Sequence, residues 1–276
     1  PVGAGYVFCD IIESDRYSGM ELTHIFRQAM ESLIVTNAHM VNGGERIDLS
    51  KKDSDFFYLA TDSEEKTSAV IANLCKTRLP RAYDMTVFDG IQVITPSRKG
   101  QNGTEMLNSV LQSALNPAGV GKKEKKLRDV IFREGDKVMQ TKNNYDIPWK
   151  KNGADGTGVF NGDIGIIVKI DLGEQLLHID FDGRLAEYDF AMADELELAY
   201  AITVHKSQGS EYPIVILPLY RYTPKLLTRN LFYTAITRAQ QMVILVGDGE
   251  VANMMVENNR QTKRYTGLLY WLTQYD

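Results

Sequence analysis

A polar loop stands directly before a strongly apolar run in the segment Ala199–Leu219, AYAITVHKSQGSEYPIVILPL. Thr203, His205 and Lys206 bring a hydroxyl, an imidazole and an ammonium group close together in this loop. Phosphate and sugar oxygens accept hydrogen bonds from these donor types. The chemistry that the loop could do is therefore the binding of phosphates and sugars.

Two further residues of this loop suit a nucleotide. Gly209 would let the backbone approach a ligand closely, and Glu211 could accept a hydrogen bond from a ribose hydroxyl. By residue type alone, a polar loop before a strand is more often a plain solvated connection. Residue types and spacing by themselves leave both interpretations open.

A second segment, RNLFYTAITRAQQMVILVGD, places Arg238 on a predicted helix that precedes a predicted buried strand. An arginine in this position is often only a surface ion pair or a cation at a helix end. The alternative is an arginine finger, whose planar donors neutralise charge on a transferring phosphoryl group and are worth ~10³- to 10⁵-fold in rate. The residues alone do not decide between the two.

Taken together, TVHKSQGSE (203–211) and YTAITRA (233–239) resemble motifs V and VI of superfamily 1 helicases, in the RecD-like branch. Upstream, LTHIFRQA (22–29) resembles motif IV, and QVITPSRKGQNGTEMLN (92–108) resembles the next DNA-contacting segment of that family. PVGAG at the start is similar to the run after motif III. The resemblance follows the family's order over nearly the whole chain.

For the nucleotide, the resemblance implies that Arg27 and Arg238 reach the γ-phosphate from opposite sides of a cleft. It makes Gln28 a companion of Arg27, and it places Gly209 and Glu211 near the nucleotide. The cofactor would be ATP with Mg²⁺.

For DNA, the resemblance implies that Thr203, His205 and Lys206 face a single strand. Thr95 and Arg98 would grip a further phosphate. Without the resemblance, Thr95 is equally well explained as a strand-end residue and Arg98 as part of a solvated turn. Likewise, an ordinary ion pair one helical turn along the chain could account for Arg27.

The elements that must position these residues follow an α/β rhythm. We predict helices over Ile25–Gly44, from Ser63 onward and over TEMLNSVLQSAL, and strands at IQVITP, PIVILPLY and MVILVGD. NLFYTAITRAQQ is predicted to be a helix that includes Arg238.

Strand and turn patterns replace the helical period between Lys122 and Glu197, where GVFNGDIGII resembles the small SH3-like barrel that RecD-like helicases carry. Asn143 and Tyr145 of this insertion could hold a single strand and stack its bases. The alternative for Tyr145 is packing within the barrel. We interpret KKEKK (122–126) as a solvated linker and Asn152–Gly158 as a loop too rich in glycine for regular structure.

The expected fold class is thus α/β: a RecA-like parallel-sheet domain of the P-loop-NTPase type that lacks the P-loop and carries an SH3-like insertion. The expected domains are residues 1–121 and 198–276 of the RecA-like unit, with 122–197 as the insertion.

No GxxxxGK[ST] string occurs in the 276 residues, and Asp194-Glu195 follow no buried strand of the kind that precedes a magnesium-binding acidic pair. We therefore expect half of an ATP site, with the nucleotide and Mg²⁺ bound mainly by an N-terminal motor domain. The opening Pro1 fits a fragment of a longer protein.

The overall amino-acid composition limits the class of protein further. With 43% hydrophobic and 24% charged residues the chain reads as a globular protein, and its net charge of −5 means that nucleic-acid binding must rest on local clusters. Cys9 and Cys75 stand alone, which argues against a zinc site or a disulfide scaffold and favours a reducing cytoplasm. No apolar run suggests a membrane span or a signal peptide.

The function expected from the resemblance is the C-terminal part of a 5′–3′ DNA helicase in repair or recombination, with single-stranded DNA, the N-terminal motor domain and recombination-nuclease subunits as partners. Three alternatives remain open: a non-catalytic single-strand-binding module, half of an RNA helicase, and the helicase part of a conjugative relaxase. A small-molecule α/β enzyme lacks a paired carboxylate, a nucleophile elbow or a metal cluster in this sequence.

Overall fold

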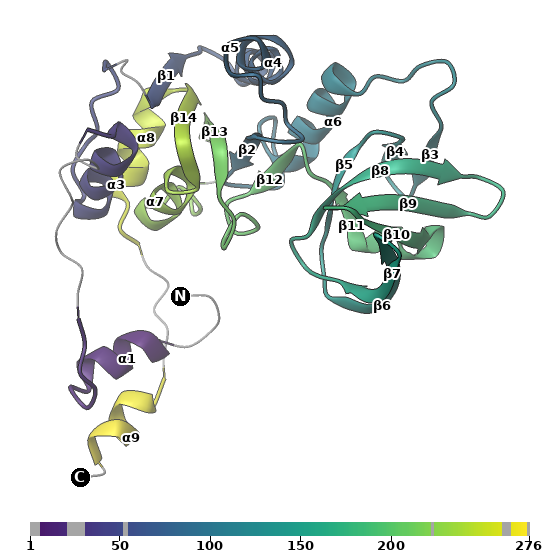
Figure 1. The fold of residues 1–276 in the computed structure, drawn as a ribbon. Coiled ribbons are helices and arrows are strands. Elements are labelled where there is room, and N and C mark those ends of the chain that lie inside the picture. The colour runs from purple at the N-terminus through teal and green to yellow at the C-terminus, as the bar shows by residue number, and fades with distance from the viewer. Residues whose placement is uncertain (1–5, 21–30, 52–54, 222–223, 261–265, 275–276) are drawn as a thin grey trace.

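A five-stranded, all-parallel sheet forms the centre of the larger part of the molecule (Figure 1). The computed structural model describes residues 6–20, 31–51, 55–221, 224–260 and 266–274. In spatial order the strands are β1 (Phe56–Ala60), β14 (Ala239–Gly247), β13 (Tyr212–Leu219), β2 (Ile91–Thr95) and β12 (Ala201–Thr203).

The central strands are apolar on both faces because both faces are covered by helices. In β13, Val215 and Leu217 point into one buried core, while Ile214 and Ile216 point into the other. The first core is closed by α3 (Leu33–Gly43), α7 (Arg229–Ile236) and α8 (Gly249–Glu257), and the second by α4 (Glu64–Asn73) and α6 (Thr104–Leu115). This double coverage explains why PIVILPLY and MVILVGD show no alternation of polar residues.

Side-chain caps fix the start of several helices. Ser63 caps α4 by accepting a hydrogen bond from the backbone N–H of Lys66. The helix α6 matches the predicted TEMLNSVLQSAL and starts after Gly103 without a side-chain cap. The helix predicted from Ile25 to Gly44 is instead α3, which begins after the cap residue Ser32. Residues 25–30 of that prediction lie outside the described residues.

A short π-helical segment, η1 (Leu74–Arg78), and α5 (Leu79–Tyr83) continue α4 toward the start of β2. Away from the sheet, α1 (Val7–Glu13) and α9 (Leu268–Gln274) lie side by side near the two ends of the chain (Figure 1). No helix in the described ranges is long and apolar enough to span a lipid bilayer.

An antiparallel assembly, here named the β unit (residues 124–198), is inserted between α6 and β12 and lies at the end of the molecule opposite α1 (Figure 1). Its main sheet has the order β11-β5-β8-β9-β10-β6-β7, and a separate hairpin pairs β3 with β4. The strands are β3 (Glu124–Leu127), β4 (Val130–Arg133), β5 (Lys137–Gln140), β6 (Asn144–Lys151), β7 (Ala154–Val159), β8 (Ile164–Asp171), β9 (Leu176–Phe181), β10 (Arg184–Asp189) and β11 (Leu196–Leu198).

The Asn152–Gly158 segment was wrongly predicted to be a loop, because most of it belongs to β7, which pairs with β6. Its glycines are explained by packing rather than by irregularity. A Cβ atom on Gly156 would come within 2.3 Å of the Trp149 ring, so only glycine lets the indole lie against the strand.

The interpretation of KKEKK as a solvated linker was also wrong, since Glu124 to Lys126 lie in β3. Lys125 Nζ lies 5.5 Å from the centroid of the Phe190 ring, and Glu124 accepts a hydrogen bond from Arg133. The pairing of β3 with β4 and these two side-chain contacts thus overrule the local charge pattern.

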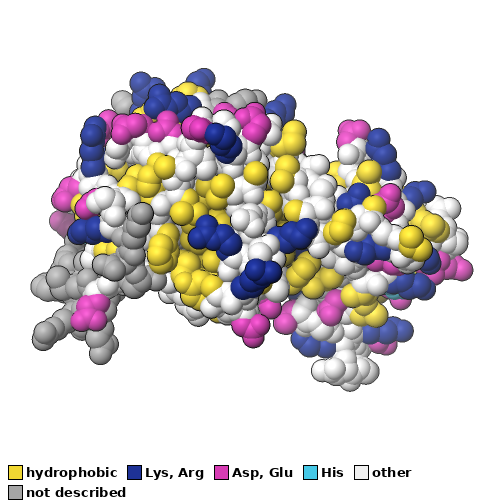
Figure 2. Space-filling view, turned by 90° about the horizontal axis from the view of Figure 1, so that it is seen from above, with side chains coloured by type: hydrophobic (Ala, Val, Ile, Leu, Met, Phe, Trp, Pro, Cys, Tyr) yellow, Lys and Arg dark blue, Asp and Glu magenta, His cyan; other side chains and the backbone are white. Residues whose placement is uncertain are grey.

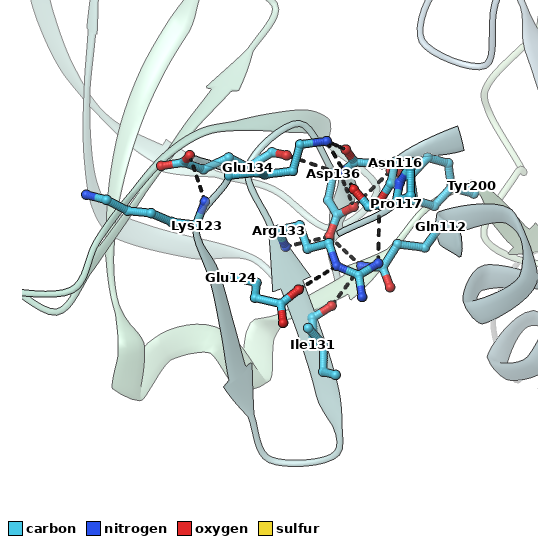
Figure 3. Close-up of polar contacts among 11 residues, drawn as sticks. Gln112, Asn116, Pro117, Lys123, Glu124, Ile131, Arg133, Glu134, Asp136 and Tyr200 are labelled. Atoms are coloured by element: carbon cyan, nitrogen blue, oxygen red, sulfur yellow. Dashed lines mark hydrogen bonds and ion pairs between the residues drawn. The ribbon is translucent and has the colours of Figure 1, made fainter. Parts of the chain in front are cut away.

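A buried polar cluster joins the β unit to the parallel-sheet part of the chain (Figure 3). The carboxylate of Asp136, which is fully buried, accepts hydrogen bonds from Gln112 Nε2 (2.6 Å), Asn116 Nδ2 (2.7 Å), the Tyr200 hydroxyl (2.9 Å) and the Arg133 backbone N–H (2.7 Å). Burial raises the pKa of Asp136, and these hydrogen bonds partly oppose that shift. Because Gln112 and Asn116 come from the end of α6, the cluster fixes that helix to the β unit.

The next residue, Lys137, makes the second buried connection. Its Nζ donates to Gln92 Oε1 (2.9 Å) and to the backbone carbonyl of Val87, and Gln92 in turn donates to the carbonyls of Ala199 and Tyr200. Two consecutive residues of the β unit therefore anchor it to β2 and to α6. Where the domains divide along the sequence remains a prediction.

Candidate nucleotide and nucleic-acid interface

The polar loop singled out in the sequence forms a short crossover between two parallel strands, here named the crossover turn (Val204–Glu211). β12 ends at Thr203, which pairs with Thr95 at the carboxyl end of β2. β13 pairs with β2 from Ile214, opposite Ile91 at the amino end. The crossover turn thus brings the chain from one edge of the sheet back to the other.

Internal hydrogen bonds hold the crossover turn in a helical shape. The backbone N–H of Lys206 donates to the carbonyl (3.0 Å) and hydroxyl (3.3 Å) oxygens of Thr203, and the buried Ser207 hydroxyl donates to the Val204 carbonyl (2.8 Å). His205 is exposed. Gly209 has a φ of 88°, a backbone conformation that favours glycine, and it too is exposed.

The ammonium group of Lys206 is directed at the β unit. Its Nζ donates to Asn161 Oδ1 (2.5 Å) and to the Thr141 carbonyl (3.1 Å). Thr141 follows β5, and Asn161 lies between β7 and β8. The crossover turn is therefore tied at this point to two loops of the β unit.

Arg238 lies just past the end of α7, between that helix and β14, and not within a helix as predicted. Its Nε, Nη1 and Nη2 donate to the Thr234 carbonyl (3.1 Å), the Ser210 carbonyl (3.2 Å) and the Thr237 hydroxyl (3.4 Å). A guanidinium group carries five N–H donors, so these bonds within the described residues occupy three and leave two. The side chain is half-buried and held in one orientation while keeping donors for a ligand.

Glu211 is exposed at the end of the crossover turn and accepts a hydrogen bond from Gln240 Nε2 (3.0 Å). The backbone N–H of Tyr212 donates to the Arg238 carbonyl (2.8 Å), so Glu211 and Arg238 share the amino-terminal edge of β13 and β14. The structure thereby brings together two residues expected near a nucleotide. Arg27 and Gln28 lie outside the described residues.

The opposite, carboxyl-terminal edge of the sheet contains Thr95. This residue is fully buried, its hydroxyl donates to the Asn102 carbonyl (2.7 Å), and it also bonds the Tyr220 hydroxyl (3.0 Å), which reaches Ser97 Oγ at 2.8 Å. Burial raises the pKa of Tyr220. The expected phosphate contact by Thr95 does not fit this burial, because the side chain instead fixes the loop that leads into α6.

Arg98, in contrast, lies on the surface with 62% of its side chain exposed. It pairs with Glu197 (2.8 Å) and more distantly with Glu105 (3.9 Å). Exposed ion pairs of this kind contribute about 0–1 kcal/mol, so a phosphate could compete for the guanidinium group. The first N–H groups of α6 are not similarly open, since those of Thr104 and Glu105 donate to the carbonyls of Ser97 and Arg98.

Asn143 and Tyr145 lie in the β unit next to the partners of Lys206. Asn143 Oδ1 accepts from the backbone N–H of Asn161 (3.0 Å). The Tyr145 ring is 66% exposed and meets Phe160, 40% exposed, edge to face at a centroid distance of 5.5 Å. The alternative that Tyr145 packs inside the β unit does not fit this exposure.

The acidic pair Asp194-Glu195 has structural partners. Glu195 Oε2 accepts from Gln140 (2.8 Å) and Asn144 (2.9 Å), and Lys142 lies 3.3 Å from Glu195 and 3.8 Å from Asp194. These contacts fasten the start of β6 to the end of the β unit. That this pair does not bind magnesium stays a prediction.

Comparison with known proteins identifies both parts of the chain. Residues 107–181 match the family model described as the ATP-dependent RecD-like DNA helicase SH3 domain, and residues 198–246 match the UvrD-like helicase C-terminal domain. The chain belongs to the RecD-like helicase family. Its fold is accordingly the RecA-like α/β domain expected from the sequence, with the β unit as the SH3-like insertion.

Two curated relatives carry RecD names. The ATP-dependent RecD2 DNA helicase of Deinococcus radiodurans is 32% identical over 250 residues, covering 91% of this RecD-like chain and 31% of that protein. The RecBCD enzyme subunit RecD of Mycolicibacterium smegmatis is 26% identical over 284 residues, covering 97% of this chain and 46% of that protein. The RecD-like chain thus spans less than half of the length of either relative.

Among solved structures, the Pif1 helicase from Bacteroides in complex with ADP-AlF3 and ssDNA resembles this RecD-like chain with a TM-score of 0.48 and 18% identity. The match covers 86% of this chain and 53% of that one. A likeness of this degree does not place individual residues.

Sequence reasoning missed three residues of this RecD-like site. Ser210 acts through its backbone carbonyl, which any residue type carries, so no pattern could have indicated it. Asn161 lies in GVFNGDIGII (158–167), which indicated only the resemblance to the SH3-like barrel. Phe160 was grouped with the apolar residues of a barrel strand, and only its exposure in the folded chain distinguishes it.

Proposed function

We propose that this chain is the C-terminal motor half of an ATP-dependent DNA helicase that moves 5′ to 3′ along single-stranded DNA, in repair or recombination. The observation that carries the proposal is Arg238, which is held by the Ser210 carbonyl of the crossover turn and keeps two donors open at the sheet edge. The names of the relatives support the helicase class. Polarity, strand preference and pathway come from the family resemblance.

In this proposal ATP supplies the phosphoryl group whose charge Arg238 neutralises during transfer. Arg27, with Gln28, would approach the same phosphate from the other side, and Glu211 would contact the ribose beside Gly209. The donor set fits because a fixed, planar guanidinium group with open N–H donors matches phosphate oxygens. An N-terminal motor domain would provide the P-loop and the ligands of Mg²⁺.

The proposed DNA contacts use the exposed part of the predicted set. His205, Arg98, Asn143 and Tyr145 are exposed. Thr203 is half-buried and caps the crossover turn through its hydroxyl oxygen, whose own hydrogen can still be donated to a phosphate. Lys206 is treated separately below.

Movement would arise from closure of the cleft around ATP and its reopening after hydrolysis. Ser210, which holds Arg238, and Lys206, which holds the β unit, belong to the same crossover turn. A displacement of Arg238 toward a γ-phosphate would therefore be transmitted to the DNA-facing end of this turn. Such coupling supports a motor rather than a passive binding module.

The test is the Arg238→Ala variant of the full-length protein, assayed for DNA-stimulated ATP hydrolysis. We expect kcat to fall by ~10³-fold or more, the effect of removing an arginine finger. Arg238→Lys should be similarly impaired, since lysine keeps the charge but loses the planar donors.

Arg46→Ala is the matched control, because Arg46 is an exposed arginine that pairs only with Glu257 among the described residues. Near-normal ATPase activity of Arg238→Ala would exclude the finger role. Single-strand binding by the wild-type protein without any ATPase activity would favour the non-catalytic binding module instead.

A further inference from the structure

Two aromatic rings are exposed together at the end of the β unit that faces the crossover turn. Tyr145, near the start of β6, is 66% exposed, and Phe160, just after β7, is 40% exposed. Their ring planes meet at 73° with centroids 5.5 Å apart. This edge-to-face arrangement lets the rings support each other while most of the Tyr145 surface stays in solvent.

The loops that carry these rings are held rigid by side-chain amides and carboxylates. Asn161 donates its backbone N–H to Asn143 Oδ1 (3.0 Å), and the backbone N–H of Phe160 donates to Asp163 Oδ2 (3.1 Å). The first bond links the loop before Tyr145 to the loop that contains Phe160, and the second lies within the latter loop. The orientation of the aromatic pair is therefore fixed before any ligand arrives.

Lys206 connects this end of the β unit to the motor part of the chain. Through Nζ it reaches Asn161 Oδ1 and the Thr141 carbonyl, one in each of the two loops. Its ammonium group is thus already bound to protein oxygens. The exposed residue Gln208 lies two positions farther along the crossover turn.

We infer that Tyr145 and Phe160 form a stacking site for the unpaired bases of a single strand, and that Lys206 is a positioning residue that sets this site beside the crossover turn. The inference deepens the proposed function and rests on it. Base faces stack on aromatic rings without regard to sequence, which suits a motor that moves along DNA. Asn143, beside the rings, offers amide groups that base edges or sugars can use.

The surroundings favour a nucleic acid over a protein partner. On the face shown in Figure 2, positive and negative side chains are interspersed, and the β unit forms the lobe at the right. The side chains of Asn143 and Asn161, which hold the loops next to the aromatic pair, add neutral amides to its surroundings. The Nδ2 groups of these amides can donate hydrogen bonds to base edges and sugars, which a single strand presents along its length.

The first experiment measures binding of a fluorescein-labelled oligothymidylate to the full-length protein at several salt concentrations. Tyr145→Ala and Phe160→Ala should each weaken binding about tenfold, as expected for the loss of one base–aromatic contact. The slope of log K against log salt should stay unchanged, because stacking displaces no counterions. Tyr83→Ala is the matched control, since Tyr83 is 43% exposed on α5, outside the proposed site.

A backbone-only probe separates stacking from other effects. An oligonucleotide of abasic sites should bind the wild-type protein less tightly, and Tyr145→Ala should cause no further loss with this probe. Tyr145→Leu and Phe160→Leu keep apolar bulk in the two positions and guard against misfolding, and both should weaken binding to oligothymidylate as the alanine variants do. Wild-type affinity of the leucine and alanine variants would overturn the stacking site.

Lys206 is tested by the same salt titration. Lys206→Ala should weaken binding with an unchanged slope, and Lys206→Gln should restore part of the affinity because its amide can still donate to Asn161 or Thr141. A slope reduced by about one in Lys206→Ala would show a phosphate contact and would overturn the positioning role. DNA-stimulated ATPase of the wild-type protein is measured in parallel: its absence counts against the proposed function, whereas unaffected variants of an active protein count only against this inference.

Discussion

At the level of single residues, the two cations at the centre of the interface are used in different ways. Arg238 satisfies part of its guanidinium group with carbonyls and a hydroxyl and keeps donors open. Lys206 has its ammonium group bound to two oxygens of the β unit. The difference follows from the two side chains. The planar guanidinium group can be held in one orientation by some of its five donors while the others remain available to a ligand, whereas the compact ammonium group has only three donors.

A third cation, Lys137, leads to a pH prediction. Burial lowers its pKa to about 8 from an ordinary value of 10.5, so the folded chain favours the neutral amine more than the unfolded chain does. The stability contributed by this group is therefore complete above pH 10.5 and is lost as the pH falls through 8. Between pH 8 and 9.5 the free energy of unfolding should rise by on the order of 1 kcal/mol per pH unit relative to Lys137→Met.

Chemical denaturation at a series of pH values checks this prediction. The comparison uses the pH dependence of the two proteins and not their absolute stabilities, because Lys137→Met also loses the hydrogen bonds to Gln92 and Val87. Parallel curves for the wild-type protein and the variant in this window would show that Lys137 titrates normally.

At the level of elements, β6 and β7 show how one glycine permits a strand pair. Gly156→Ala should destabilise the chain by about 1–3 kcal/mol, because the added methyl group would collide with the rigid Trp149 ring. Combining it with Trp149→Phe should recover part of the loss by removing the ring atoms in conflict. Thermal or denaturant unfolding measures both effects.

Gly119→Ala serves as the control for that substitution, since nothing lies within 4 Å of a Cβ atom at Gly119. This variant should stay within about 0.5 kcal/mol of the wild type. Equal stability of Gly156→Ala and Gly119→Ala would mean that the indole moves aside without cost.

Elements with their own local signals were predictable from the sequence. The strand Ile91–Thr95 and the helix Thr104–Leu115 carry apolar patterns and end residues that specify them. Prediction failed where contacts between residues far apart in the sequence determine the secondary structure. Trp149 explains the glycines of β7, and Phe190 and Arg133 stabilise the charged strand β3. The predicted helix was continued through Glu31 and Ser32, where the described chain is not helical, because the cap at Ser32 was not recognised.

The site was predictable in its motif residues and not in their partners. The types and order of Arg238, His205 and Lys206 indicate a helicase segment through family resemblance. Arg238 donates to the Ser210 carbonyl, and Lys206 donates to Asn161. Both bonds depend on how the crossover turn folds back across the sheet, which the sequence does not show. Thr95 shows the converse, since a matching motif residue is completely buried.

At the level of the whole molecule, the chain by itself should behave as half of a motor. We expect no measurable ATPase activity from the purified 276-residue chain, because it contains no GxxxxGK[ST] loop. Binding to single-stranded DNA should be weak and should fall with added salt, with a slope of roughly −0.7 per phosphate contacted. Turnover of ATP by this chain would contradict the assignment of the phosphate-binding floor to another domain.

The pairing of β11 with β5 has a consequence for how such an architecture could arise. Leu198, where the polypeptide leaves the β unit, lies opposite Val138, and Asp136, two residues before Val138, accepts a hydrogen bond from Asn116 at the end of α6. The two ends of the insertion are thus close together. With respect to the parallel sheet, the whole insertion is equivalent to one long loop between α6 and β12. Because the entropy of closing such a loop grows only with the logarithm of its length, extra polypeptide could be accommodated here over evolutionary time with little thermodynamic penalty to the sheet.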